Sequence, residues 1–310
     1  MPKACLIIVF NHRYDKNIPV LEKMYGGRFS AIYFLVPFYN GKQPNVIPVY
    51  ESSNFFQSFF AQGFSRFFKE AYSHYLFLGD DCILNPSINE TNFLEQTGLP
   101  DKADFIPGLI EFHKAKTYSW WHTFKGIDFF RNRKGAEIKN ELPSREDAVT
   151  RFEKNGISVQ PLTKENIFGT HTPSSQKWWR YAALKRYYWF NWKPFRKNGK
   201  IELPYPIAGA YSDILIITKE TLPDFCRYCG IMAAAGLFVE IAIPTALLLS
   251  SQSIKQEKDA RLKGKALWSA QEIEAVEKKF NKSLSALLKN FPTGELYCHP
   301  VKLSKWTNDL

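Results

Sequence analysis

Short apolar runs that alternate with helical patterns constrain the fold of this chain more than any other feature of its sequence. Continuous apolar runs rich in β-branched and aromatic residues occupy 5–10 (CLIIVF), 31–36 (AIYFLV), 45–50 (NVIPVY) and 75–78 (YLFL). Such runs are typical of parallel strands that are buried on both faces. Helical patterns lie between them, over 18–24 and over 55–73, where phenylalanines recur at spacings of three and four. This order predicts a mainly parallel, Rossmann-like α/β sheet flanked by helices.

The middle of the sequence has a different texture. From 111 to 204 the strand signals fade and Trp, Phe, Lys and Arg interleave, which predicts an aromatic and basic helical insertion. The later segments predict a glycine-bearing turn and strand, a buried helix, a polar loop and an amphipathic helix, over 207–218, 238–250, 254–265 and 270–290. We therefore predict two halves of one core, 1–110 and 205–310, separated by the insertion 111–204.

Polar clusters follow two of the predicted strands. Asn11-His12-Arg13 follows the first strand, and Gly79-Asp80-Asp81 follows the fourth. Open parallel sheets bind their ligands at these carboxyl ends. Adjacent carboxylates are costly to desolvate unless they meet a cation, and Mg²⁺ or Mn²⁺ prefers carboxylate oxygen. The pair predicts a cation that bridges to phosphate groups, although two solvated aspartates in a turn are the alternative.

The segment YLFLGDDCIL resembles the DxD segment of glycosyltransferases with the GT-A fold, in which an apolar strand ends in an acidic triplet. Gly79 stands where the first acid often is, so the pattern is met only in part. The resemblance implies that Asp81 binds a divalent cation, Mn²⁺ or Mg²⁺. It also implies that Asp80 contacts the donor sugar or its ribose.

The tail Cys298-His299-Pro300-Val301-Lys302 is similar to the C-terminal segment of the same enzymes. That similarity implies that His299 completes the metal shell and that Lys302 binds the donor diphosphate. Neutral imidazole is a common metal ligand, and lysine binds phosphate as a point charge. A surface histidine, or one held by ordinary hydrogen bonds, is the alternative.

Other positions match the GT-A pattern in chain order. Gly209 has no side chain to block a close approach of substrate to the backbone, and Asp213 is placed to hydrogen-bond a sugar hydroxyl. Glu240, a lone acid in an apolar stretch, resembles the xED region, which implies a general base in an inverting enzyme or an acceptor anchor in a retaining one. Asn11 is the candidate for reading the base and Arg13 for a phosphate. Ordinary turns, and a buried glutamate bonded to backbone, remain the alternatives.

The net charge of +11 suggests a polyanionic partner, which includes nucleic acid, an anionic membrane surface and a phosphate-bearing substrate. The leading hypothesis is transfer of a sugar from a nucleotide-diphosphate donor, UDP-linked or similar, to a glycan or lipid-linked acceptor. A nucleotidyltransferase is the alternative enzyme, but it would have a glycine-rich loop after the first strand. A non-catalytic binder of nucleic acid or an anionic surface is the other alternative. Nucleic acid is not expected, because an acidic pair without a metal repels phosphate.

Five cysteines at irregular spacing, without a secretory signal, predict a reduced cytoplasmic protein. Cys226 and Cys229 form a CxxC motif with no second pair, which favours a structural role over zinc binding. The stretch 177–200 is dense in Trp, Tyr, Lys and Arg. It predicts peripheral docking on the inner, anionic face of a membrane, stacking on acceptor sugars, or a helical hairpin packed on the core.

Overall fold

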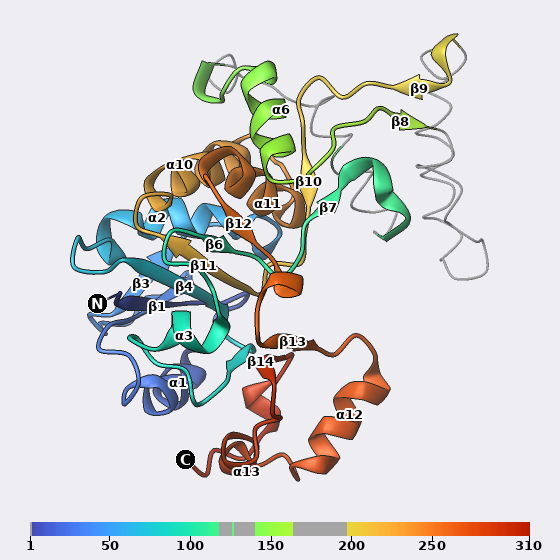
Figure 1. Ribbon diagram of the computed structural model, residues 1–310. Coiled ribbons are helices and arrows are strands. Elements are labelled where there is room, and N and C mark those ends of the chain that lie inside the picture. The colour runs from blue at the N-terminus through green and yellow to red at the C-terminus, as the bar shows by residue number, and fades with distance from the viewer. Residues whose placement is uncertain (1, 118–125, 127–139, 164–196) are drawn as a thin grey trace. The chain divides into compact units, whose positions relative to one another are not determined.

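The computed structural model describes residues 2–117, 126, 140–163 and 197–310, and the chain forms two compact units (Figure 1). The first unit comprises Met1–Gly108, Tyr211–Gly230 and Ser250–Leu310. The second comprises Leu109–Ala210 and Ile231–Leu249. The segment Ile231–Leu249, which we predicted in the second half of the core, thus belongs to the same unit as the predicted insertion.

The first unit is built on a seven-stranded sheet. Its strands are β1 (Ala4–Val9), β2 (Ile32–Pro37), β3 (Val46–Val49), β4 (His74–Gly79), β6 (Asp104–Phe105), β11 (Ile214–Thr218) and β12 (Ile254–Lys255). They lie in the spatial order β12-β6-β11-β4-β1-β2-β3. Strands β1 to β4 pair in parallel, β12 is parallel to β6, and β11 runs antiparallel to both of its neighbours. The predicted mainly parallel α/β sheet is therefore confirmed, and it is compatible with a Rossmann-like fold.

Helices and a smaller sheet complete the first unit. Its helices are α1 (Ile18–Tyr25), α2 (Gln57–Phe67), α3 (Phe93–Thr97), the start of α10 (Leu222–Ala234), α12 (Ala270–Lys279) and α13 (Leu284–Lys289). Short 3₁₀ helices are η1 (Asp15–Asn17), η2 (Ser53–Phe55), η5 (Glu257–Asp259) and η6 (Leu303–Lys305). The smaller sheet has the order β13-β14-β5 and consists of β5 (Ile83–Leu84), β13 (Lys263–Ala266) and β14 (Glu295–His299).

Both faces of the large sheet are buried, as continuous apolar strands require. On one face Leu6 and Ile8 of β1 belong to the same hydrophobic core as Tyr25 of α1. On the other face Phe77 of β4 packs against Phe60 of α2, with ring centroids 4.8 Å apart. Figure 1 shows α1 and α3 on one side of this sheet and α2 on the other. Alternate residues of each strand therefore supply two separate cores, which fixes the strand register.

Helix α2 ends earlier than its hydrophobic pattern predicts. The phenylalanine spacing predicts a helix over 55–73, whereas the observed helix ends at Phe67. The Tyr75 hydroxyl accepts a hydrogen bond from the Lys69 N–H and donates one to the Lys69 carbonyl, both at 2.8 Å. Because the backbone after the helix is held by a side chain of β4, tertiary contact overrides the local helical preference.

The C-terminal third contains more breaks than its sequence pattern predicts. The single helix predicted over 270–290 is divided into α12 and α13 by Asn281 and Lys282, whose φ angles are 49° and 52°. Ser283 then caps α13 by accepting a hydrogen bond from the Ala286 N–H. The polar loop predicted over 254–265 instead contains β12 and the start of β13. Both are short edge strands whose pairing partners lie far away in the sequence, so no local periodicity indicates them.

The described residues of the second unit form two short strand pairs, several helical segments and a buried helix. Its elements are β7 (Ile110–Glu111), η3 (Phe112–Thr117), α6 (Arg145–Lys154), β8 (Leu162–Thr163), β9 (Lys200–Ile201), β10 (Ala208–Gly209) and most of α11 (Val239–Ser250). Helix α11 is buried nearly throughout, as predicted. The Ala208 N–H donates to Thr245 Oγ1 at 3.1 Å, which ties α11 to β10 and explains why this helix belongs to the second unit.

Most of the predicted membrane-docking stretch, including Trp178, Trp179, Tyr187, Tyr188, Trp189 and Trp192, lies outside the described residues. Among the helices that the structure describes, none combines the length and the apolar character that crossing a membrane requires.

Candidate functional site

Main-chain hydrogen bonds hold the acidic pair at the carboxyl end of β4. The Asp80 N–H donates to the Val9 carbonyl at the end of β1, at 3.0 Å. The Gly79 N–H donates at 2.9 Å to the Asp213 carbonyl, which precedes β11. The loop is therefore fixed to the strands on both sides of β4, and its carboxyl groups are placed at the edge where parallel sheets bind ligands.

The C-terminal tail reaches the same edge through the smaller sheet. Strand β14 pairs with β5, which follows the acidic pair in the chain, and the register places Cys298 opposite Ile83. Beyond β14 the Val301 N–H donates to the Asp81 carbonyl at 2.7 Å. These main-chain bonds bring His299 and Lys302 to the acidic loop from the far end of the sequence.

The imidazole of His299 lies between two carboxylates. Its Nε2 is 3.2 Å from Asp81 Oδ1, and its Nδ1 is 3.4 Å from Asp213 Oδ2. Burial lowers the pKa of His299, but the close contact with the Asp81 carboxylate and the negative charges of Asp213, Asp81 and Asp80 outweigh it, so this pKa is raised. Burial also raises the pKa of Asp213; the nearby Asp81 charge acts in the same direction and His299 acts against it. The three groups form one electrostatically coupled cluster.

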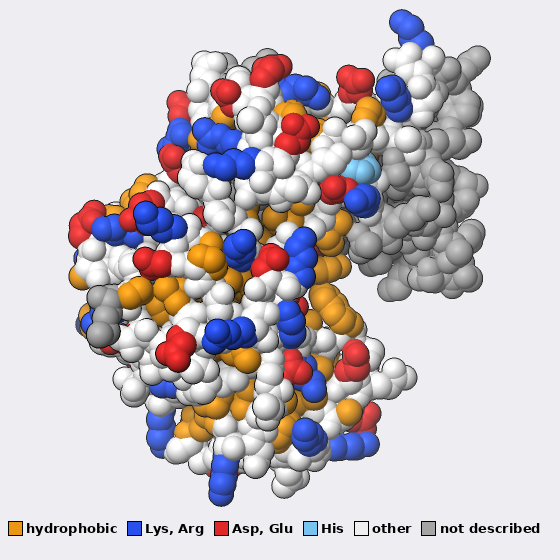
Figure 2. All heavy atoms as spheres, in the orientation of Figure 1, with side chains coloured by type: hydrophobic (Ala, Val, Ile, Leu, Met, Phe, Trp, Pro, Cys, Tyr) orange, Lys and Arg blue, Asp and Glu red, His pale blue; other side chains and the backbone are white. Residues whose placement is uncertain are grey.

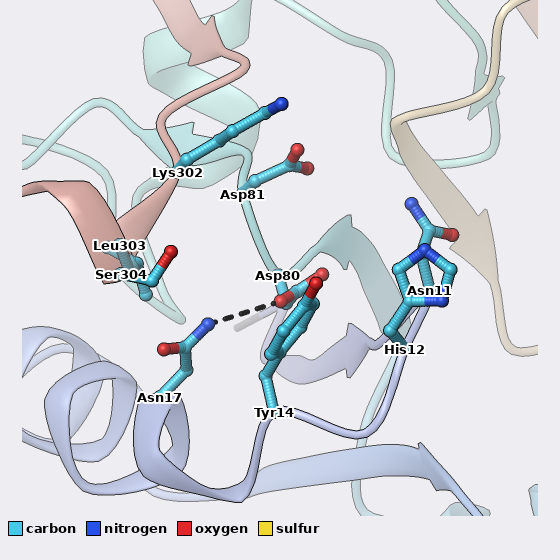
Figure 3. A pocket seen from close by; sticks show the side chains of 9 residues that line it. All are labelled: Asn11, His12, Tyr14, Asn17, Asp80, Asp81, Lys302, Leu303 and Ser304. Atoms are coloured by element: carbon cyan, nitrogen blue, oxygen red, sulfur yellow. Dashed lines mark hydrogen bonds between the residues drawn. The ribbon is translucent and has the colours of Figure 1, made fainter.

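Asp80 is the most deeply buried acid of the loop, with 6% of its surface exposed. Burial, and then repulsion by Asp81, raise the pKa of Asp80 to about 7. Asn17 Nδ2 donates to Asp80 Oδ2 at 3.4 Å, as the dashed line in Figure 3 marks. Near pH 7 both the protonated and the charged form of this carboxyl group are populated, so it can donate a hydrogen bond to a ligand hydroxyl or accept one from it.

A cavity of about 310 Å³ opens beside this cluster (Figure 3). Its volume is within the range of small-molecule sites. The side chains around it come from the ends of β1 and β4, the start of α1 and the tail, and they are Asn11, His12, Tyr14, Asn17, Asp80, Asp81, Lys302, Leu303 and Ser304. Amide, carboxyl, hydroxyl and ammonium groups thus converge on one space, which suits a polar ligand that carries negative charge.

Asp81 and His299 are the predicted metal ligands that the structure brings together. Asp81 Oδ1 is buried and makes no hydrogen bond of good geometry, although it lies 3.2 Å from His299 Nε2. Neighbouring ligands of an octahedral cation with bonds of about 2.1 Å are separated by roughly 3 Å, so this spacing fits. Among the residues that the structure describes, no three His, Cys, Asp or Glu side chains already converge as a metal site.

The predicted site residues fall into two groups. The structure brings together Asn11, Asp80, Asp81, His299 and Lys302, and Asp213 joins them through His299. Gly209 and Glu240 belong to the second unit, where the Ala210 N–H donates to the Glu240 carbonyl at 3.0 Å. The roles predicted for these two residues stay predictions.

Arg13, the residue predicted to bind phosphate, is engaged elsewhere. Its guanidinium donates to the Asp15 carboxylate, to the Phe38 carbonyl and to Asn40 Oδ1. It is not among the residues that line the cavity described above. In this structure Arg13 therefore connects the loop after β1 with the loop after β2. The lysine that lines the cavity is Lys302.

Several residues that line the cavity were given no role from the sequence. Asn17 lies just before α1, and His12 and Tyr14 lie in the loop after β1. They could have been found by treating the whole segment between the first strand and the first helix as a binding loop. Ser304 could have been found by extending the tail motif beyond Lys302. The contact of Asp213 with His299 had no local signal, because it depends on the antiparallel pairing of β11 with β4.

Gly79 lies close to the Asp81 carboxylate and leaves little room there for a side chain. A Cβ atom at Gly79 would lie 3.3 Å from Asp81 Oδ1. We expect Gly79→Ala to displace this carboxylate by a few tenths of an ångström and to weaken Mn²⁺ binding about 10-fold, with the fold intact. Isothermal titration with Mn²⁺ measures this. Gly27→Ala, whose Cβ would meet nothing within 4 Å, is the matched control and should bind as the unmodified protein does. Equal affinity in all three proteins would contradict the steric account.

Comparison with models of protein families, with curated proteins and with solved structures finds no match for this chain.

Proposed function

We propose that the protein is a glycosyltransferase of the GT-A type, which transfers a sugar from a nucleotide-diphosphate donor to a hydroxyl of a glycan or lipid-linked acceptor. The observation that carries this proposal is the meeting of His299 with Asp81 and Asp213 beside a cavity lined by Lys302. The main chain brings His299 to the acidic loop, but removing carboxylates from water beside one imidazole is costly. A ligand that carries a cation and meets the Lys302 side chain would offset that cost.

In this proposal each side chain has a defined task. Asp81 and His299 hold Mn²⁺ or Mg²⁺, and Asp213 either joins them or orients the imidazole from its Nδ1 side. The cation, when bound, neutralises the charge that develops on the departing diphosphate. Lys302 adds a positive charge on the cavity wall, and Asn11 and Asn17 supply amide groups for the nucleoside. Asp80, with a pKa near 7, binds a hydroxyl of the ribose or sugar.

The distribution of charge favours a small phosphate ligand over nucleic acid. On the face shown in Figure 2, basic and acidic side chains of the described residues intermingle, with no continuous basic stripe. Nucleic-acid binding proteins usually present such a stripe along one face. The acidic cluster described above would repel a phosphate backbone, whereas a cation chelated by a single diphosphate removes that repulsion. Docking on an anionic membrane, and the general-base role of Glu240, remain part of the proposal.

A melting-temperature screen tests this proposal. We expect UDP and Mn²⁺ together, each well above its dissociation constant, to raise the melting temperature by roughly 5 °C, because a ligand at 100 times its dissociation constant stabilises by about 2.7 kcal/mol. UDP alone and Mn²⁺ alone should shift it much less. Other nucleoside diphosphates belong in the panel, since the base is open. A shift with single-stranded oligonucleotide and none with any nucleotide plus Mn²⁺ would refute the proposal.

A further inference from the structure

An exposed tryptophan stands next to the candidate site. Trp268, which lies between β13 and α12, has 65% of its surface exposed. Its ring centroid is 4.6 Å from that of Tyr211, with the ring planes tilted by 60°. The Trp268 N–H donates to Glu272 Oε2 at 2.9 Å, and Glu272 also forms a capping box with Ser269. The main chain under this aromatic pair is therefore held in place, while much of the indole surface faces solvent.

The chain connects this aromatic pair directly to the acidic cluster. The Leu267 N–H donates to the His299 carbonyl at 2.7 Å, so Trp268 follows a residue bonded to the histidine of the cluster. Ala266 is paired with His299 in the register of β13 and β14. On the other side, Tyr211 lies two positions before Asp213, whose carboxylate faces His299 Nδ1. Each ring therefore comes from a segment that also positions one member of the cluster.

We propose that Trp268 and Tyr211 form a platform that binds one pyranose ring of the carbohydrate acceptor, an inference that rests on the proposed function. A pyranose has an apolar face of C–H groups and a rim of hydroxyl groups. An indole ring offers a large apolar surface with little conformational entropy to lose. The neighbouring Asp213 carboxylate can accept hydrogen bonds at the rim of such a sugar.

The size and the charge of the surroundings favour a sugar over other occupants. Two aromatic side chains cover far less than the roughly 800 Å² that each partner contributes to a standard protein–protein interface. Anionic lipid headgroups would meet the carboxylates of Asp81 and Asp213 beside the platform, which is electrostatically unfavourable. A neutral ring with one apolar face matches both the area and the polarity.

Binding of simple glycosides to the full chain tests this proposal. The probes are methyl α- and β-glycosides of glucose, galactose, mannose and N-acetylglucosamine, measured by saturation-transfer NMR at millimolar concentration without nucleotide. We expect at least one to bind, and Trp268→Ala to weaken that binding at least 10-fold, while Trp268→Phe retains part of it. Tyr50→Ala is the matched control, because Tyr50 is 64% exposed at the end of another strand of the same unit; it should bind as the unmodified protein does.

Several outcomes would overturn the platform. These are binding of no glycoside, undiminished binding by Trp268→Ala, or an equal loss in Tyr50→Ala. The melting-temperature shift with UDP and Mn²⁺ is measured on the same variants and should persist in Trp268→Ala, which also shows that this variant folds. Glycoside binding through Trp268 without any nucleotide-dependent shift would leave the platform standing and refute the glycosyltransferase proposal. The reverse result would refute the platform alone.

Discussion

Replacing Asp81 by Asn, or His299 by Ala, should lower the affinity for Mn²⁺ by about 100-fold or more and remove the melting-temperature shift with UDP and Mn²⁺. Each side chain supplies one atom of the proposed metal site, Asp81 Oδ1 and His299 Nε2, and these atoms are 3.2 Å apart. Asn is nearly isosteric with Asp, and the bond from the Val301 N–H to the residue 81 carbonyl belongs to the main chain. The fold should therefore survive the substitution while the charge on the ligand oxygen is lost.

The measurement is isothermal titration with Mn²⁺, supported by circular dichroism to show that each variant is folded. Asp101→Asn, which alters an exposed carboxylate at the amino end of β4, is the control and should leave the affinity unchanged.

Asp213→Asn distinguishes two roles that Asp213 could have in the site. Loss of Mn²⁺ binding makes Asp213 a ligand, whereas retained binding with lost turnover makes it a substrate contact. Unchanged Mn²⁺ affinity in both Asp81→Asn and His299→Ala would refute the metal site.

The second large effect is expected at the opposite edge of the sheet, where Asp104→Ala should reduce the free energy of unfolding by about 3–5 kcal/mol. Asp104 is 1% exposed. Its Oδ1 accepts from the Thr218 N–H at 2.6 Å, and its Oδ2 accepts from the Thr221 hydroxyl at 2.7 Å and from the Ser251 hydroxyl. Truncation leaves these buried donors without their acceptor and opens a cavity where β6 and β11 meet.

Urea unfolding measures this effect. Asp104→Asn should cost less than Asp104→Ala, because its amide oxygen still accepts from the Thr218 N–H and the two hydroxyl groups can reorient toward its amide. Asp224→Ala, an exposed acid in α10 that is 3.6 Å from Arg227, is the control and should change stability by less than about 1 kcal/mol. A loss of that small size for Asp104→Ala would show that this buried network does not hold the sheet.

The penalty for Asp104→Ala should also depend on pH. Burial raises the pKa of Asp104 in the folded state, although the hydrogen bonds from Ser251, Thr218 and Thr221 act against this. The folded protein therefore binds this proton more tightly than the unfolded chain does, and the contribution of Asp104 to stability declines as pH rises through its folded-state pKa. The difference between the unmodified protein and the variant should be larger at pH 4.5 than at pH 7.5.

Local sequence pattern was enough to predict the parallel part of the sheet and part of the cavity. The runs that became β1, β2, β3 and β4 are apolar because both faces of these strands are buried, and this burial is visible in single segments. Asn11, Asp80 and Asp81 could be placed at one edge because parallel strands end there together. His299 and Lys302 could be assigned to the same place only through the resemblance, since no local rule connects the tail with β4.

The missed features depend on contacts between distant segments. The hydroxyl of Tyr75 holds the backbone of Lys69 after α2, and no helical propensity contains that information. The division between α12 and α13 requires positive φ angles at Asn281 and Lys282, which their side chains permit but do not demand. Besides the nearby Asp15, Arg13 bonds to Asn40 and to the Phe38 carbonyl, two partners in the next loop that its local sequence does not indicate.

The late position of β14 in the sequence affects the order in which the parts of the candidate site can fold during synthesis. Strands β1 to β4 can pair before the tail is made, because His299 follows Asp81 by about 220 residues, which take roughly 10–45 s at typical rates of translation. Until then Asp81 and Asp213 repel each other without the imidazole between them. Docking of the tail relieves that repulsion, so the pocket is complete only after the tail has been made and has docked.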